Sequence, residues 1–214
     1  TDTWAKNYMD YPSSAKFSHN ESVHDEMYED GIYMGYRYFD SFDVETEYCF
    51  GFGRSYTEFE LKAGEISVNG NEVQIPVEVK NIGSKYAGKE VVQVYYSVIG
   101  GEIDKPYQEL AAYKKTKLLA PGESEQLVLT YPVSQMASYS EQEAAWVLEQ
   151  GEYVIRVGNS SASTVAAGVA EVKESVKTVI AKNLFALDVE LEEIRPDAGK
   201  LAAKKQASVG ADVK

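Results

Sequence analysis

The sequence predicts a mainly β protein, a β-sandwich preceded by an irregular N-terminal extension. The first observation is the alternation of apolar and polar residues in Val73–Lys80, which is the period of a half-buried strand. The second is that short candidate strands follow one another with turn signals between them and without long helices, as in all-β sandwiches. The third is a change of composition near residue 57, where a stretch rich in Tyr, Asp, Glu and Gly gives way to alternating Val, Ile and Tyr.

Candidate strands can be placed in order along residues 58–178. In the second of them, Val92, Val94, Tyr96 and Val98 share one face, and the pair Gly100-Gly101 ends the run. Pro121-Gly122 marks a further turn. The expected strands are 73–80, 91–98, 109–118, 125–131, 145–149, 152–158 and 164–173.

Two places in this region depart from a simple strand pattern. Pro76 cannot donate a ladder hydrogen bond, so its strand is expected at a sheet edge or at a bulge. Residues 133–149 begin with a helical pattern that Ser134 would cap, and they end in a strand that carries Trp146.

The chain divides by composition into three parts. Residues 1–57 have no sustained apolar period, so they are expected to fold only against another surface. Residues 58–178 form the predicted sandwich. Residues 179–214, rich in Ala, Lys and Glu, are expected to be a linker or tail, with one helical turn over 188–194 before Pro196.

Composition excludes several classes of function. The formal net charge of -13 disfavours nucleic acid and anionic membrane surfaces, both of which require a basic patch. A single cysteine, Cys49, excludes an internal disulfide and a multi-cysteine metal site. No apolar run is long enough to cross a membrane, and no cofactor motif is found. The chain starts without Met or a signal peptide, as a piece of a longer chain would, and bacterial cytoplasm is favoured over secretion.

Each candidate catalytic or metal-ligating residue is better explained by a structural role than by a reaction. Carboxylate clusters at 25–26, 29–30 and 40–47 are candidates for a glycosidase pair by type alone, and a solvated acidic surface explains them better. His19 and His24 match no compact zinc spacing. Cys49 lies between aromatic residues without a His or Asn context, so a buried structural thiol is expected. The sequence therefore assigns no catalytic, cofactor-binding or metal-binding residue.

An aromatic run in the N-terminal part leaves two interpretations open. Aromatic faces suit sugar rings, so the run could be a platform for carbohydrate. It could equally pack one domain against another, with the nearby glycines letting the backbone turn beneath bulky rings, and this is the interpretation we favour. Its members are Tyr33, Tyr36, Tyr38, Phe39, Phe42, Phe50, Phe52, Tyr56 and Phe59.

Two blocks of sequence carry a resemblance to a known family. The first comprises Tyr28–Asp40 and Tyr48–Thr57 and is similar to the end of the α/β-sandwich domain of glycoside hydrolase family 3, above all of its β-glucosidases. The second runs from Pro106 through Leu119–Ser124, Trp146 and Gly151–Tyr153 to Val157–Ser161 and resembles the fibronectin type III-like domain that follows. The chain departs from the family pattern at three positions of the connecting segment, with Asp30 for the usual Glu, Cys49 for Pro and Arg54 for Leu.

The resemblance implies a non-catalytic accessory fragment with a fibronectin type III-like, immunoglobulin-like fold. The family's nucleophile lies on a (β/α)₈ barrel and its acid/base in the α/β-sandwich domain, and neither can be placed on this sequence. The expected partners are those two domains and, for the parent alone, a β-glucoside; a homodimer is a further candidate. In a permuted clostridial subgroup the barrel would follow residue 214. The alternative function is a carbohydrate-binding module that uses the aromatic segment.

Overall fold

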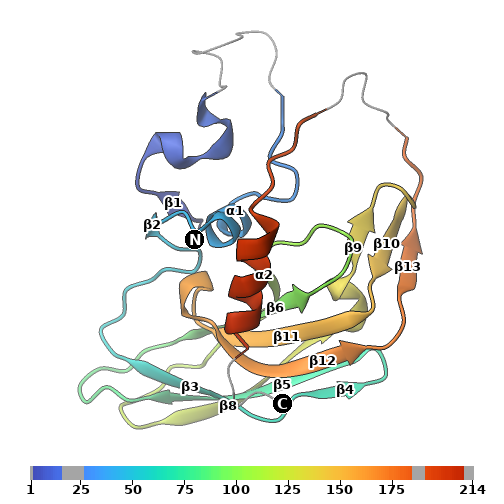
Figure 1. The fold of residues 1–214 in the computed structure, drawn as a ribbon. Coiled ribbons are helices and arrows are strands. Elements are labelled where there is room, and N and C mark those ends of the chain that lie inside the picture. The colour runs from blue at the N-terminus through green and yellow to red at the C-terminus, as the bar shows by residue number, and fades with distance from the viewer. Residues whose placement is uncertain (1, 16–26, 185–190, 210–214) are drawn as a thin grey trace.

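The computed structural model describes residues 2–15, 27–184 and 191–209. Two four-stranded antiparallel sheets stack face to face as a sandwich, which confirms the predicted fold class (Figure 1). The lower sheet contains β3 (Phe59–Ala63), β4 (Ser67–Asn69), β5 (Glu72–Asn81) and β8 (Ser124–Pro132). The upper sheet, in the order β12-β11-β6-β7, contains β6 (Val91–Ile99), β7 (Glu109–Lys115), β11 (Gly151–Gly158) and β12 (Val165–Val172).

The hydrophobic core fills the space between these two sheets. The alternation seen in the sequence decides which side chains enter it: Val73, Ile75, Val77 and Val79 of β5 are all fully buried. The upper sheet supplies its own alternate residues, and Leu119, Leu127 and Leu129 complete the layer. The upper-sheet members are Val92, Val94, Tyr96, Val98, Tyr153, Ile155 and Val157. The face assigned from sequence to the strand at 91–98 is therefore confirmed.

The position of Pro76 differs from the expectation. β5 is a central strand, paired with β8 on one side and with β3 and β4 on the other, so the edge assignment was wrong. On the β3–β4 side, β3 pairs with residues 77–81 and β4 with residues 72–74, and Pro76 falls in the gap between them. The Pro76 carbonyl accepts from the Gly64 amide at 2.8 Å in that turn. A proline is tolerated in a central strand here because no neighbouring strand needs its amide.

A third, smaller sheet extends from one end of the sandwich, on the right in Figure 1. It has the order β13-β10-β9, with β9 (Ser138–Ser140), β10 (Ala145–Leu148) and β13 (Val176–Ile180). The strand predicted at 145–149 is β10. A short 3-10 helix at Val133–Met136 precedes it, but its N-cap is Pro132, without a side-chain hydrogen bond, so the predicted Ser134 cap was wrong.

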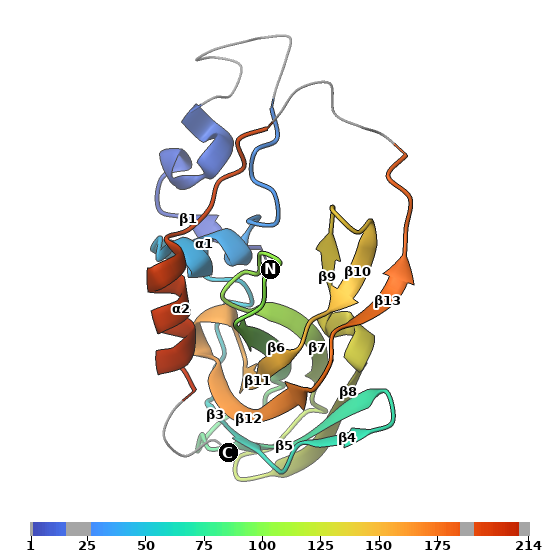
Figure 2. The ribbon, with the colours of Figure 1, turned by 45° about the vertical axis from the view of Figure 1, so that its right-hand side comes forward.

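The N-terminal and C-terminal parts form a third layer above the upper sheet (Figures 1 and 2). The N-terminal part contains a two-stranded sheet of β1 (Trp4–Ala5) and β2 (Thr46–Tyr48) and the helix α1 (Tyr36–Phe42). The C-terminal part contains α2 (Ala198–Ala207), which contacts β6. The helical turn expected before Pro196 lies partly outside the described residues, and the described part, 191–196, is not helical.

Candidate functional site

The N-terminal extension covers the outer face of the upper sheet and forms the candidate site, an interface between two parts of the chain. Gly35, at φ +55°, turns the backbone into α1, and Asp43, at φ +55°, ends the helix. Tyr36 of α1 packs edge-on against Tyr95 of β6, with ring centroids 5.8 Å apart, and tilts against Phe50 at 5.0 Å. Because this layer covers it, β6 is buried on both faces along most of its length.

Most of the aromatic run packs inside this layer. Phe39 is 2% exposed and meets Tyr11 at 5.6 Å, and Tyr33 is 1% exposed and meets Phe42 at 5.2 Å, both in edge-to-face geometry. The packing interpretation is confirmed for these rings. Tyr56, which is 92% exposed, departs from it.

A buried polar cluster joins α1, β11 and the chain just before β7. Gln108, which is fully buried, donates to Asp40 Oδ2 at 2.9 Å and to the Ser161 carbonyl at 2.7 Å, and accepts from the Thr164 hydroxyl at 2.9 Å. Burial raises the pKa of Asp40 to about 6, although the hydrogen bond from Gln108 opposes the shift. Arg156 lies over the Tyr107 ring, 5.2 Å from its centroid, and burial lowers its pKa. Within the cluster, the hydrogen bond from Gln108 to Asp40 crosses from the sandwich to α1 and helps to fix the extension on the sheet.

The C-terminal segment closes the same interface from above. The Ile194 amide donates to the Glu29 carbonyl at 2.8 Å, which joins the tail to the extension. Lys204 of α2 donates to the Asp40 carbonyl and to Asp43 Oδ1, both at 2.5 Å, and its Nζ lies 4.5 Å from the Tyr107 ring centroid. Residues 191–209 therefore contact both the extension and the sandwich, whereas the sequence suggested only a linker or tail.

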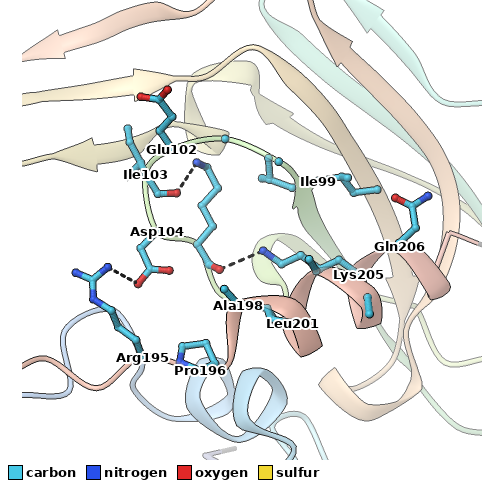
Figure 3. Close-up of a pocket in the computed structure, with 16 residues that line it drawn as sticks. Ile99, Glu102, Ile103, Asp104, Arg195, Pro196, Ala198, Leu201, Lys205 and Gln206 are labelled. Carbon is cyan, nitrogen blue, oxygen red and sulfur yellow. Dashed lines mark hydrogen bonds and ion pairs between the residues drawn. The ribbon is translucent and has the colours of Figure 1, made fainter.

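A pocket of about 570 Å³ lies between α2 and the loop after β6 (Figure 3). Lys205 reaches across it and donates to the Lys105 carbonyl at 3.1 Å, and Arg195 approaches Asp104 Oδ2 at 3.7 Å. Asp104 also accepts from the Tyr33 hydroxyl at 2.6 Å, which links the loop to the extension. Lys205 is 7% exposed, and burial lowers its pKa to about 8.

The loop after β6 also contains a buried lysine, Lys105, and this one is paired with a carboxylate. Lys105 forms an ion pair with Glu149, and Glu149 also accepts from the Glu102 amide at 2.7 Å and the Ile103 amide at 3.3 Å. Burial by itself would raise the pKa of Glu149, but the hydrogen bonds from Lys105 and from these amides outweigh it and lower the pKa. The pair fixes the loop to the start of β11. No period or motif in the sequence marked Lys105, Glu149 or Lys205, because buried charges have no sequence signature of their own.

The residues considered for catalysis take structural roles or fall outside the description. Asp43 and Glu45 are ion-paired with Lys204 and Lys6, respectively. His19, His24 and the 25–26 carboxylates lie outside the described residues. Cys49 is free and only half-buried, which differs from the expected buried thiol. Gly51 adopts φ +84°, and a Cβ there would lie 2.4 Å from Gln93 Nε2, so this glycine allows a close approach to a glutamine side chain.

Two further searches cover the described residues alone. Within 2–15, 27–184 and 191–209, no group of three or more His, Cys, Asp or Glu side chains could hold a metal ion. In the same ranges, no helix is long and apolar enough to cross a membrane.

The sandwich and the layer above it define a β-sandwich domain together with a segment that packs on its outer face. Residues 90–161 match the family model of the fibronectin type III-like domain. The chain is 39% identical over 186 residues to β-glucosidase A of Butyrivibrio fibrisolvens. This match covers 77% of the present chain and 22% of the relative.

Solved structures agree with this assignment. A β-glucosidase from Paenibacillus barengoltzii superposes with a TM-score of 0.78 at 39% identity, over 85% of this chain and 21% of the enzyme. β-Glucosidase 3B from Thermotoga neapolitana, solved in complex with glucose, superposes with a TM-score of 0.75 at 43% identity, over 82% of this chain and 24% of that enzyme. The chain therefore corresponds to the fibronectin type III-like portion of the β-glucosidases of glycoside hydrolase family 3, and the resemblance seen in the sequence is confirmed. It spans about a fifth of their length.

Proposed function

We propose that this chain is the non-catalytic accessory part of a family 3 glycoside hydrolase whose other domains hydrolyse terminal β-glycosidic bonds with retention. The observation that carries the proposal is the extent of the similarity, which covers 85% of this chain but only 21% of the Paenibacillus enzyme. The match covers too much of the chain to lie within residues 58–214 alone, so it includes part of the extension as well as the sandwich. The parent's α/β-sandwich and (β/α)₈-barrel domains are the proposed partners.

The chemistry of the described carboxylates supports an inactive fragment. Retaining hydrolysis requires two carboxyl groups about 5 Å apart on opposite sides of a sugar pocket, one of them free to attack. Here Asp43 and Glu45 are neutralised by lysines, Glu149 is held by Lys105, and Asp40 accepts from Gln108. Each of these four carboxyls has a partner within the chain, which supports the proposal that none of them acts on a substrate.

The exposed apolar residues of the extension support a partner domain above it. A lone apolar side chain on a surface needs no explanation, but several on one short segment indicate a covered surface. Their exposed fractions range from 56% to 72%. They are Trp4, Tyr8, Met9, Tyr28 and Met34. We propose that the missing α/β-sandwich domain covers them in the parent.

The experiment is an activity assay with p-nitrophenyl β-glucoside. The purified chain should release no nitrophenol above the buffer rate, whereas the full-length parent enzyme, assayed at equal molarity, should turn the substrate over. Clear turnover by the chain that follows its elution profile would refute the inactive assignment. A parent that keeps full activity and stability after deletion of this segment would refute the accessory role.

The alternative, a carbohydrate-binding module built on the aromatic run, is less favoured because Tyr33 and Phe39 are buried. Titration of the chain with cello-oligosaccharides decides between the two. The permuted domain order, the division at residues 57 and 178, and a homodimer stay predictions.

A further inference from the structure

A groove of about 760 Å³ lies where the extension leaves the outer face of the upper sheet. Its wall is the segment Phe50–Ser55, and its floor is formed by β6 and β7. This volume is within the usual range for small-molecule sites. The groove is separate from the interface around Asp40 and from the pocket under α2, and neither the family match nor the accessory role assigns it a ligand.

The floor of the groove is set by the register of two strands. Gln93 of β6 lies opposite Tyr113 of β7, and Val91 lies opposite Lys115. Residues two apart on a strand share a face, so these four side chains form a two-by-two array on the outer face. Tyr113 is 72% exposed and offers the array's one aromatic ring to solvent.

The wall and floor are held in place by hydrogen bonds. The Ser161 amide donates to the Phe50 carbonyl at 2.9 Å, and Gln93 donates to the Asn159 carbonyl at 2.9 Å. Glu90, a carboxylate that lines the groove, accepts from Asn159 Nδ2 at 3.1 Å and from the Val91 amide at 2.7 Å. The groove is therefore largely preformed, which reduces the entropic cost of binding a ligand.

The charge of the groove opposes the charge of the whole chain. Its lining contains three cations, Arg54, Lys89 and Lys115, and one carboxylate, Glu90, so its formal charge is +2 on a chain of -13. Among the described residues, none of the three cations forms an ion pair with a carboxylate of the chain. Arg54 stands where the family pattern that the sequence resembles has Leu.

We propose that this groove binds a saccharide that carries carboxylate groups. Tyr113 stacks on the apolar face of a sugar ring, since aromatic rings offer a flat apolar surface of matching size. Arg54, Lys89 and Lys115 pair with the carboxylates, and Arg54 can do so with two parallel hydrogen bonds. Charge complementarity favours an anionic over a neutral sugar, and the exposed ring favours a sugar over a plain acidic peptide. The inference goes beyond the accessory role and does not depend on it.

The test is calorimetric titration of the full 214-residue chain with trigalacturonate, and with cellotriose as the neutral sugar of equal length. We expect saturable 1:1 binding of trigalacturonate that weakens several-fold between low and high salt, because exposed charge pairs are screened. Tyr113→Ala should weaken binding about tenfold. Arg54→Leu, which restores the family's usual residue, should weaken it about threefold to fivefold, the effect of one exposed ion pair. Lys173→Gln removes an exposed lysine outside the groove and should change nothing.

Several outcomes would overturn the proposal. Equal affinity for cellotriose and trigalacturonate, or no saturable binding of either sugar, would refute the hypothesis that the groove binds an anionic saccharide. Binding that Tyr113→Ala and Arg54→Leu leave intact would place the site elsewhere. Binding of an oligoglutamate peptide without binding of trigalacturonate would assign the groove to an acidic protein segment instead. Circular dichroism spectra and thermal midpoints must match those of the wild type, so that a loss of affinity in a variant reflects the groove and not misfolding.

Discussion

Replacing the buried lysine of α2 by methionine should stabilise the protein at neutral pH and remove one component of its pH dependence. Lys205 is 7% exposed, and its pKa is about 8, against 10.5 for a free lysine. Burial is the main cause, and the nearby Lys105 adds to it, while Asp104 and Glu109 oppose it. Below pH 8 the folded protein must keep a charge in a poorly solvated place, which costs free energy.

The sign and size of the effect follow from proton linkage. Between pH 8 and 10.5 the unfolded chain binds a proton at Lys205 that the folded chain has lost, so the wild type gains stability as the pH rises. The difference between 10.5 and about 8 corresponds to about 3 kcal/mol over that range. Lys205→Met keeps most of the side-chain volume and removes the charge. It leaves the Lys105 carbonyl without this donor, which costs about 1 kcal/mol and reduces the gain at pH 7 to about 2 kcal/mol.

The assay is urea unfolding of wild type and Lys205→Met at several pH values between 7 and 10.5. Every other titrating group is common to both proteins, so the difference in unfolding free energy isolates Lys205. The variant should be the more stable at pH 7, and the difference should reverse or vanish by pH 10.5. A difference that stays flat across this range would show that Lys205 is solvated in the folded protein and that α2 does not pack as described. Lys200→Met, an exposed position on the same helix, is the matched control.

Three further substitutions test the core and the interface. Asn81→Ala should cost about 3 kcal/mol of unfolding free energy. The reason is that this fully buried amide donates to two carbonyls and accepts from the Thr57 hydroxyl and the Gly83 amide. A loss below about 1 kcal/mol would contradict that network. Phe39→Ala should cost about 3 kcal/mol and speed proteolysis within the extension ahead of the sandwich; simultaneous cleavage of both would argue against separate layers. Glu149→Gln should lower the unfolding free energy at pH 7 and flatten its dependence on pH in the acid range. Because folding lowers the pKa of Glu149, its stabilisation of the wild type is present above the unfolded pKa of Glu and is lost as the pH falls through the folded pKa. An acid limb identical to that of the wild type would refute this role.

Six of the eight strands of the sandwich were predictable because the signal for each is local, whereas β3 and β4 were not among the expected strands. The alternation in 73–80 requires one face to be apolar, and the same four residues line the core. A two-sheet arrangement follows, since each strand has one apolar face to bury. Neighbours in a sheet are not local, so the sequence could not show that β3 and β4 lie end to end beside β5, and Pro76 was misplaced for that reason.

The sequence by itself determined the fold class and the motif blocks of the family, and it favoured a packing role for the aromatic run. Only the tertiary structure decided that α2 and residues 191–195 close over the extension, that Lys105, Glu149 and Lys205 are buried, and that three cations gather beside Tyr113 on an acidic chain. The physical reason is the range of the interactions. Periodicity is encoded in neighbouring residues, whereas burial of a charge depends on segments about a hundred positions apart, as Lys105 and Lys205 are.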